Sequence, residues 1–560
     1  MKRTDTLWTL AALAIVAAAI VSPFFFLGSA SGHDFDFHAA AWLDVAAQWR
    51  LGVLFPRWAE WANWGHGEPR FIFYPPLSWI LGAVLGLILP WNAVPGAFVW
   101  LAVVASGMAM RSFAGRLLSS RGAFFAALFY AANPYVLLVV YFRSDFAELL
   151  ALALFPLLAN EVLRSGAAAA RTLPRLALVF AAIWLCNAPA GVLAGYSLCL
   201  LIVVVSLQRK SVRPLAAGAS AIVLGFLLAA FYIVPAAYEQ SWVNIAQALS
   251  SGLKPADNFL FTTIDDPDHN VFNVIASALA VTMIAIAGFA AVAARRDAEP
   301  AKAESRLAGA AMLALAAVCA VMMFPVTAPL WRWLPKLRFV QFPWRWAGLL
   351  GVSMAYFLAA VAARKRWRWI VVIFLLAMYA GTGAFLVRHA WWGSDAIPDL
   401  QQAIANGSGY EGTDEYDPLG DDRTDLPKNA PRAAVLRADE DADQPSAEDA
   451  VRIRIERWMP EEKLIRVEAR QPAQIALRLL NYPAWRVEVD GQLVRTTTVE
   501  GTAQMVVPVH AGENLVRVRF VRTADRIAGG LLSLLGAALL LLLFWKGTSV
   551  RNHAGPSAPA

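Results

Sequence analysis

Apolar residues in this chain occur mainly in long, nearly uninterrupted runs. A run of roughly 20 apolar residues has the length of a helix that crosses a bilayer. The run at 173–207 is too long for one crossing, and Asn187-Ala188-Pro189 supplies a turn in its middle, so it is predicted as a helical hairpin. The pattern predicts twelve transmembrane helices, at about residues 7–27, 94–112, 120–140, 146–163, 173–187, 190–207, 214–235, 270–294, 307–326, 345–363, 368–387 and 525–545.

Two segments depart from this pattern. The run from Pro75 to Leu89 is apolar but short, and it opens with two prolines. We predict a helix there that lies at the outer membrane surface, as part of a first outer loop at 28–93. Residues 395–450 are polar, whereas 451–523 alternate apolar and polar positions in the manner of strands. Asp490-Gly491 between two such runs is a hairpin signal, so a small outward-facing β-sandwich is predicted.

The predicted fold class is therefore an all-α polytopic membrane protein with about 12 transmembrane helices and a β-rich domain before the last helix. We expect a transmembrane catalytic module at 1–387, an outer domain at 388–523, and a last helix with a cytoplasmic tail at 524–560. Only 16% of the residues are charged, against about 25% in soluble proteins. The three cysteines lie inside apolar runs and indicate neither a disulfide framework nor a zinc site.

Basic residues gather in short loops, which are expected on the cytoplasmic side. Both termini then lie in the cytoplasm, and the loop 28–93 lies on the outer side of the membrane. The net charge of +7 reports this orientation and does not indicate nucleic acid. The first apolar run follows Lys2 and Arg3, but it is longer than the core of a signal peptide and is expected to stay uncleaved. The clusters are Lys2/Arg3, Arg111/Arg116/Arg121, Arg164/Arg171/Arg175, Arg209/Lys210/Arg213, Arg295/Arg296/Arg306, Arg364/Lys365/Arg366/Arg368 and Lys546/Arg551.

The first outer loop carries the strongest candidate chemistry, in the segment His33-Asp34-Phe35-Asp36-Phe37-His38. Ionisable groups beside a membrane are retained mainly where they react or bind. Asp34 and Asp36 are the candidate catalytic residues. They are expected to share a Mg²⁺ or Mn²⁺ ion, or one of them acts as a general base. The plain alternative is that Asp34 caps the helix that begins near Asp36.

Two further outer segments each contain an arginine whose position suggests an anionic ligand. Arg143 lies in a short turn followed by Asp145 and Glu148, and guanidinium binds phosphate oxygens bidentately. Asp145 and Glu148 also fit a helix cap and its third residue. Arg345 lies just before the tenth predicted span, where a basic residue runs against the orientation rule and suggests an anionic ligand. The alternative for Arg345 is a snorkelling side chain in an aromatic belt.

The remaining substrate-binding candidates are polar or aromatic residues of the outer segments. Tryptophans of the first loop offer stacking faces for sugar rings. The acidic segments 265–269 and 410–416, like the surroundings of Glu239, resemble ordinary solvated loops. The alternative for 410–416, which places hydrogen-bond acceptors beside aromatic faces, is a sugar-recognition loop. No Walker loop is present in the sequence. The candidates are His33, His38, Arg57, Trp58, Trp61, Asn63, Trp64, His66, Tyr74 and Glu239.

Together these motifs resemble the GT-C superfamily of polytopic glycosyltransferases. They are most similar to a bacterial branch with YfhO-like proteins and "6-pyruvoyl-tetrahydropterin synthase-related" membrane proteins. That label implies no pterin chemistry, because the sequence shows no soluble zinc-histidine domain. The motifs are Gly32-His-Asp34…His38, Pro56-Arg-Trp58, Asn63-Trp-Gly65-His-Gly67-Glu-Pro69, Phe73-Tyr-Pro-Pro-Leu77, Arg143…Glu148, Gln341-Phe-Pro-Trp-Arg345 and Tyr482-Pro-Ala-Trp485…Asp490-Gly491.

The resemblance implies a polyprenyl-phosphate-linked sugar as donor and a glycan, lipid or protein acceptor at the outer face of a bacterial inner membrane. It implies that Asp34 and Asp36 match the first-loop acids. Arg143 and Glu148 would match a second-loop site, and Arg345 a ligand of the lipid phosphate. Cys186-Asn187-Ala188 stands where related chains place a histidine, which puts any role of that position in doubt.

Two other functional classes remain, a transporter or flippase of lipid-linked glycans and a non-catalytic scaffold of envelope assembly. A transporter needs ionisable residues near mid-bilayer. The predicted spans are nearly free of charge, and polar groups gather at one face. This distribution favours chemistry at the surface. The sugar, the acceptor and the linkage are not indicated by the sequence.

Overall fold

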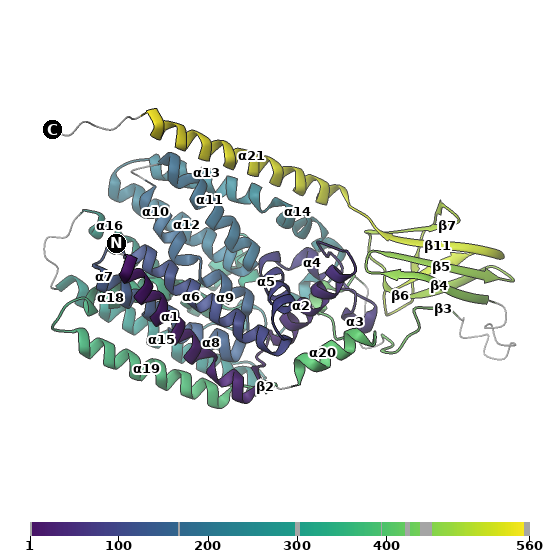
Figure 1. Ribbon diagram of the computed structural model, residues 1–560, viewed down its shortest axis with the longest axis horizontal. Helices are drawn as coiled ribbons and strands as arrows, with labels where there is room; N and C mark the ends of the chain where they lie inside the picture. Colours follow the sequence, from purple (N-terminus) through teal and green to yellow (C-terminus); the bar gives the residue numbers. More distant parts are fainter. Residues whose placement is uncertain are drawn as a thin grey trace.

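The computed structural model describes residues 3–165, 169–296, 303–393, 395–419, 426–436 and 451–553. A bundle of helices forms most of the molecule, and a β-domain projects from one end of it (Figure 1). The first half of the bundle consists of α1 (Arg3–Leu27), α2 (Phe35–Arg50), α3 (Ala62–Gly65), α4 (Arg70–Phe73), α5 (Pro76–Ile88), α6 (Val94–Ala114), α7 (Ser120–Ala131), α8 (Pro134–Leu138), the π-type turn η2 (Val139–Arg143), α9 (Phe146–Leu152) and α10 (Phe155–Arg164).

The second half of the bundle begins with a hairpin. Asn187 forms its turn and accepts a hydrogen bond from the backbone N of Ala190 at 2.9 Å, which caps α12. The helices are α11 (Ala169–Cys186), α12 (Ala188–Arg209), α13 (Arg213–Leu228), α14 (Ala230–Glu239), α15 (Pro267–Arg296), α16 (Ala303–Met322), α17 (Ala328–Trp333), α18 (Trp346–Ala362), α19 (Arg368–His389), α20 (Ala396–Ala405) and α21 (Ala524–His553).

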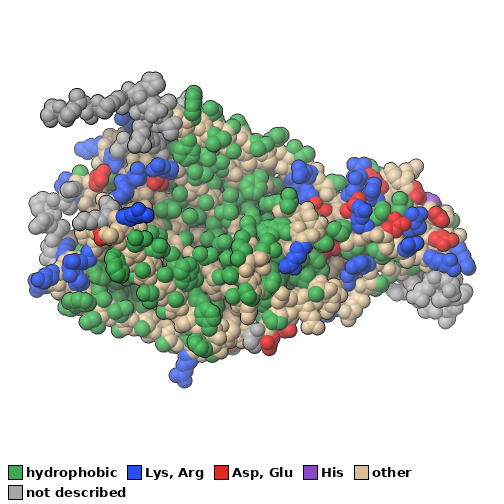
Figure 2. All heavy atoms as spheres, in the orientation of Figure 1, with side chains coloured by type: hydrophobic (Ala, Val, Ile, Leu, Met, Phe, Trp, Pro, Cys, Tyr) green, Lys and Arg blue, Asp and Glu red, His purple; other side chains and the backbone are tan. Residues whose placement is uncertain are grey.

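The lengths of these helices confirm a polytopic membrane protein. Within the described residues, 10 helices are long and apolar enough to cross a bilayer. The predicted span at 214–235 is the pair α13 and α14, bent by 74°, and the predicted span at 173–187 is the shorter apolar helix Thr172–Cys186. In the space-filling view the middle of the bundle is covered by apolar side chains, while charged ones gather toward the two ends (Figure 2).

The β-domain is built from two antiparallel sheets that share one apolar core. Its strands are β3 (Ala433–Val435), β4 (Val451–Met459), β5 (Glu462–Ala469), β6 (Ala473–Leu480), β7 (Trp485–Val489), β8 (Gln492–Leu493), β9 (Thr497–Thr498), β10 (Gln504–Val509) and β11 (Gly512–Phe520). The sheet orders are β3-β6-β10-β9 and β4-β5-β11-β7-β8. Asp490 (φ 50°) and Gly491 (φ 80°) form the predicted tight turn between β7 and β8. The predicted β-rich domain before the last helix is thus confirmed.

The β-domain is fastened to the bundle at its base. The Trp58 ring is fully buried and lies 5.4 Å from Trp485 and 5.7 Å from Phe520, measured between ring centroids. Lys463 of β5 donates from Nζ to Glu60 Oε2 at 2.8 Å in a buried ion pair. The two chain ends of the described bundle, the start of α1 and the end of α21, lie at the opposite end of the molecule (Figure 1).

Candidate functional site

A cavity of about 1040 Å³ lies where the ends of several helices meet at the β-domain end of the bundle. Its wall takes residues from the turn before α2, the turn between η2 and α9, the start of α12, the end of α14 and the segment before α18. Eight of the sequence candidates belong to the lining or contact a lining residue. His33, Asp34, Tyr74, Arg143, Asp145 and Arg345 belong to the lining, and His38 and Glu148 lie directly behind it.

An alternating chain of acids and arginines forms the floor of this cavity. Arg143 donates from Nη2 to Asp34 Oδ2 at 2.5 Å. The same Arg143 nitrogen lies 3.7 Å from Asp145 Oδ2, and Arg345 donates to that oxygen from Nη2 at 3.1 Å. Arg345 also donates from Nε to Glu148 Oε2 at 3.0 Å. Of the five side chains, Asp34 is the most open, at 32% exposed, whereas the other four are buried.

Local backbone structure places these five side chains together. Asp145 is the cap of α9, where its Oδ1 accepts from the backbone N of Glu148 at 2.8 Å, as the sequence pattern predicted. Ser144 adopts a left-handed conformation (φ 50°) that turns the chain sharply out of η2. Gly32 packs so closely on the backbone of Phe142 and Arg143 that a Cβ atom there would collide with it. Asp34 is thereby held beside Arg143.

Asp34 occupies the cap position of α2 without capping it. Its side chain makes no capping hydrogen bond and is directed to Arg143 instead. Burial raises the pKa of Asp34 above the usual range, and the neighbouring Arg143 opposes that shift only in part. For Asp145, burial also acts to raise the pKa, but the His38 hydrogen bond and the two arginines outweigh it and hold the pKa well below the usual range. Asp145 is thus fixed as an anion, while Asp34 can accept a proton.

The segment before α18 reaches the site through an uncommon turn. Gln341 has φ 65° and ψ −55°, and Phe342 donates its backbone N–H to Val340 O at 2.7 Å. These values define a γ-turn of the strained kind. The Phe342 ring that follows lies under both arginines, 4.7 Å from the Arg143 guanidinium carbon and 4.9 Å from that of Arg345. The turn therefore puts an aromatic face beneath the paired cations.

A loop that the sequence suggested was solvated forms another wall of the cavity. Thr413, Glu415 and Tyr416 belong to the lining. Thr413 is held by the buried pair of Glu68 and Arg70, since its N–H donates to Glu68 Oε2 at 2.8 Å. Burial raises the pKa of Glu415 to about 7. The signal available in the sequence was the alternation of acids and tyrosines at 410–416, which alone does not reveal where the loop folds.

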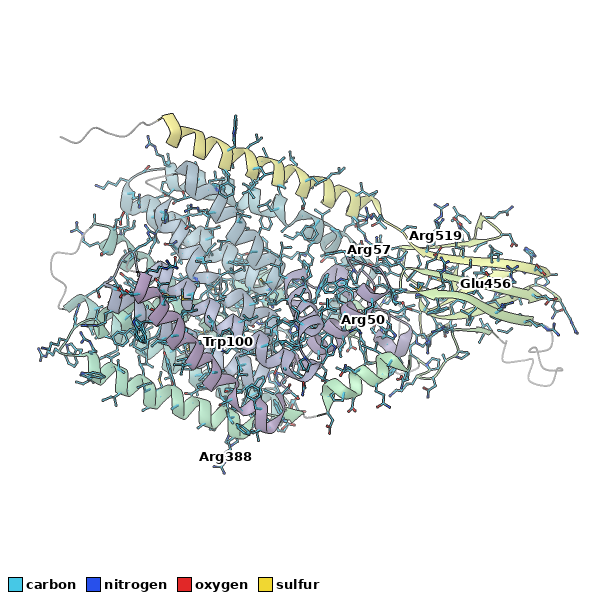
Figure 3. All side chains as sticks on the ribbon, in the orientation of Figure 1. Arg50, Arg57, Trp100, Arg388, Glu456 and Arg519 are labelled. Carbon is cyan, nitrogen blue, oxygen red and sulfur yellow. The ribbon has the colours of Figure 1, made fainter. Side chains whose placement is uncertain are left out.

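Several candidates from the first loop lie outside the cavity lining and join the bundle to the β-domain. Arg57 pairs with Glu461 at 2.8 Å, at the junction visible in Figure 3. The Trp58 ring is fully buried, and Trp61 is partly buried against the core of the bundle; neither belongs to the cavity lining. Trp64, Asn63 and His66 pack between the β-domain and the loop at 410–417. Glu239 is buried against Arg526 and Tyr482.

The acids of the first loop do not converge as a shared metal site. Asp36 is exposed and does not belong to the cavity lining, and Asp34 is engaged by Arg143. Within the part of the chain that the structure describes, no group of three or more His, Cys, Asp or Glu side chains is placed to hold a metal ion. A Mg²⁺ or Mn²⁺ ion held jointly by Asp34 and Asp36 does not fit this arrangement. Metal dependence stays a prediction, which transfer measured with and without a chelator would test.

Fold and site together define a polytopic helical membrane protein with a polar cavity at one end of its bundle and a β-domain beside that cavity. A family model described as "6-pyruvoyl-tetrahydropterin synthase related domain; membrane protein" matches residues 71–390, more than half of the chain. The chain belongs to this family of membrane proteins. The resemblance to this family that the motifs indicated is thus confirmed.

Solved structures with a similar fold are distant in sequence. The arabinofuranosyltransferase AftD from Mycobacteria is 19% identical, with a TM-score of 0.45 over 71% of this chain and 27% of that chain. ArnT from Cupriavidus metallidurans bound to undecaprenyl phosphate is 13% identical (TM-score 0.41; 72% and 75% covered). The Archaeoglobus fulgidus oligosaccharyltransferase is also 13% identical (TM-score 0.39; 71% and 55% covered). The chain thus spans about a quarter of the length of AftD. No curated protein matches it.

Proposed function

We propose that this protein is a membrane glycosyltransferase that moves a sugar from a polyprenyl-phosphate-linked donor to an acceptor at the outer face of the membrane. The acceptor class is a glycan, a lipid or a protein. One observation carries the proposal. A partly exposed carboxylate, Asp34, contacts Arg143 on the wall of a large cavity at the end of a membrane-spanning bundle.

The chemistry of glycosyl transfer fits that pair. The acceptor hydroxyl attacks the sugar C1 and loses a proton, while the C1–O bond to phosphate breaks and the phosphate leaves with the electron pair. Asp34 takes the proton as general base, for which a raised pKa is suitable. Arg143 stabilises the charge that develops on the leaving phosphate. Arg143 belongs to the cavity lining, and its buried Nε has no hydrogen-bond partner in the described protein.

Arg345 acts in this proposal as a positioning residue. Each nitrogen of its guanidinium already donates to a protein oxygen, on Glu148, Asp145 or Val340. Its positive charge holds Asp145 ionised, and Asp145 in turn lies beside Arg143. Removal of Arg345 would take from buried Glu148 its arginine partner and from buried Asp145 one of its two, which is strongly destabilising. Arg143 is therefore the direct phosphate ligand in this proposal.

The cavity also supplies apolar surface for the sugar and the lipid. Phe37, Phe73, Phe339 and Tyr416 line it beside the charged floor. Aromatic faces of this kind pack against the apolar faces of sugar rings and against isoprenoid chains. A donor at the outer face must arrive on a lipid because nucleotide sugars are absent there, and the open end of the cavity suits such a donor.

Sugar transfer by the purified full-length protein in lipid vesicles tests the proposal. We expect transfer from a polyprenyl-phosphate-sugar donor to fall by about 10²–10⁴-fold in Asp34→Asn, the range of a lost general base. Asp399→Asn is the matched control, because Asp399 is an exposed acid on α20 outside the cavity lining. Equal activity of Asp34→Asn and the wild type would remove Asp34 from the mechanism. Movement of a lipid-linked glycan across the vesicle membrane without transfer would favour the transporter.

A further inference from the structure

A second, smaller cavity of about 300 Å³ opens beside the main one. Its wall includes three cationic side chains, Arg332, Lys336 and Arg338, and two aromatic rings, Trp333 and Phe339. None of its lining residues is acidic. We call this set of five residues the cationic pocket. It stands on the short stretch of chain between α16 and α18, in which α17 is the only helix of the described residues apart from single 3₁₀ turns.

The exposed side chains around the cationic pocket are of the kinds found where a protein meets a membrane surface. Trp333 is 82% exposed and Val326 is 77% exposed, and Leu330 is also open. Trp331 faces inward and donates from Nε1 to Met322 O at 3.3 Å, which anchors α17 to the end of α16. Exposed tryptophan and aliphatic side chains at the end of a transmembrane helix lie in the interfacial layer of a bilayer. The cationic pocket therefore opens where lipid headgroups lie.

The positive charges of the cationic pocket lack acidic partners. Arg332 and Arg338 form no ion pair in the part of the chain that the structure describes. Lys336 donates to Gln240 Oε1 at 3.2 Å, and both Lys336 and Arg338 lie over the Phe339 ring, at 5.1 Å and 5.0 Å from its centroid. Burial lowers the pKa of Lys336, and the like charge of Arg338 lowers it further. Grouped cations of this kind are relieved by an anion between them.

The cationic pocket adjoins the main cavity. Lys336 and Phe339 belong to the lining of both. Lys336 has φ 60°, a left-handed conformation that is uncommon for a lysine, and it lies five residues before the γ-turn at Gln341. The two cavities are therefore neighbours along Lys336 and Phe339.

We infer that the cationic pocket receives the phosphate of a long-chain lipid phosphomonoester, the product that the donor becomes after transfer. This inference rests on the proposed function. In the donor the phosphate is a diester with one negative charge. When its bond to C1 breaks, the phosphate keeps the electron pair and becomes a monoester, whose second pKa is about 6. The lipid phosphate thus gains a second negative charge at the moment of transfer. The three cations of the cationic pocket lie next to the main cavity in which the transfer takes place.

The charge and the apolar surroundings of the cationic pocket favour a lipid phosphomonoester over other anions. A phosphodiester lipid carries one charge and gains less from three cations. Inorganic phosphate has the charge but no chain to pack along Trp333 and the open apolar face of α17. The lipid phosphomonoester satisfies both the charge and the chain. Its binding to the cationic pocket vacates the main cavity for the next donor.

Lipid binding to the full-length protein in a neutral detergent, followed by native mass spectrometry, tests the inference. The probe is undecaprenyl phosphate, compared with phosphatidylglycerol and with inorganic phosphate. We expect the double variant Arg332→Gln/Arg338→Gln to bind undecaprenyl phosphate about tenfold more weakly, as expected for lost charged hydrogen bonds. Arg332→Lys/Arg338→Lys should retain most of the affinity. Arg388→Gln is the matched control, since Arg388 is an isolated, exposed arginine at the end of α19 and points away from the bundle (Figure 3).

Three outcomes would overturn the inference. They are an unchanged affinity in the double variant, an equal loss in Arg388→Gln, and an equal loss for phosphatidylglycerol. Competition by millimolar inorganic phosphate would overturn the requirement for a lipid chain. The measurement contains no sugar donor and no turnover. Selective binding without sugar transfer in any assay would therefore contradict the proposed function and leave the cationic pocket in place.

Discussion

Asp34 is a carboxyl group under two opposing influences. Burial at the cavity floor disfavours its charged form, and Arg143 favours it. Burial is the larger influence, so the pKa of Asp34 is raised. Asp145, one contact further along the floor, has the opposite outcome because it faces two arginines and His38. Neighbouring acids with pKa values displaced in opposite directions are typical of sites that need one base and one fixed anion.

The pH dependence of transfer follows from the raised pKa of Asp34. Asp34 acts as a base only when ionised, so kcat/KM should rise as pH increases through a pKa above the ordinary carboxyl range. Arg143→Gln removes the influence that lowers this pKa, so the acidic limb of the profile should move to higher pH while the maximum rate falls. A profile of kcat/KM against pH for wild type and variant measures this shift.

Glu415 provides the check on that assignment. Its pKa is raised to about 7 and it also lines the cavity. Glu415→Gln should leave the acidic limb in place if Asp34 is the base. Loss of the limb in Glu415→Gln, with the limb unmoved in Arg143→Gln, would assign the proton to Glu415.

At the scale of elements, α2 and the loop that follows α20 are joined by a buried acid. Asp44 of α2 is fully buried and accepts from Tyr410 Oη at 2.8 Å and from Gln48 Nε2 at 2.7 Å. Burial nevertheless raises the pKa of Asp44 to about 7. The wall of the cavity at 413–416 follows Tyr410 directly, so this contact positions one side of the site.

The stability of the protein should therefore depend on pH through Asp44. Its pKa in the folded state lies above the ordinary value of about 3.9. The stability linked to its proton is complete below pH about 4 and is lost as pH rises through about 7. We expect the unfolding temperature to fall by on the order of a few degrees across this range, and Asp44→Asn to flatten that fall. Thermal unfolding in detergent between pH 5 and 8.5 measures it, and a dependence unchanged in Asp44→Asn would contradict the assignment.

The elements show how far the sequence alone could lead. Run length was enough to place most of the membrane helices, and alternation was enough to place the β-domain. The bend of 74° between α13 and α14 has no proline or glycine at the joint, Ala229, so no local signal marked it. Asp34, Arg143 and Arg345 were found because charge beside a membrane is unusual in itself. Arg57 shares that signal, and Trp58 and His66 lie in the same loop, yet all three contribute to the interface with the β-domain. The separation of 404 positions between Arg57 and Glu461 illustrates how distant the partners are in sequence.

At the scale of the whole molecule, the first outer loop contributes to two parts of the structure. Its beginning, at Asp34, forms the cavity floor, and its middle, at 57–68, forms the base of the β-domain. The ion pair of Glu60 and Lys463 lies at this base and is buried on both sides. The β-domain is therefore held in a fixed position next to the cavity, with Trp58 inserted between its aromatic side chains.

Removal of one partner of that ion pair should release the β-domain. Lys463→Met leaves Glu60 as an unpaired buried charge, which costs about 3–5 kcal/mol. The double variant Glu60→Gln/Lys463→Met removes both charges and should recover most of the loss. Hydrogen exchange of residues 57–69 measures the release. Equal exchange in wild type and in Lys463→Met would show that the aromatic contacts alone hold the domain.

The alternating chain of Asp34, Arg143, Asp145, Arg345 and Glu148 also constrains how this family diverges. Each member is balanced by the next, so replacing one alone strands a charge in a buried place. A single substitution at one of these positions should therefore be selected against, whereas paired substitutions that keep the charges balanced should be tolerated. Descendants of a common ancestor should accordingly keep all five residues or exchange them in linked sets, and aligned relatives that had lost just one would mark lineages in which the ancestral chemistry had been abandoned.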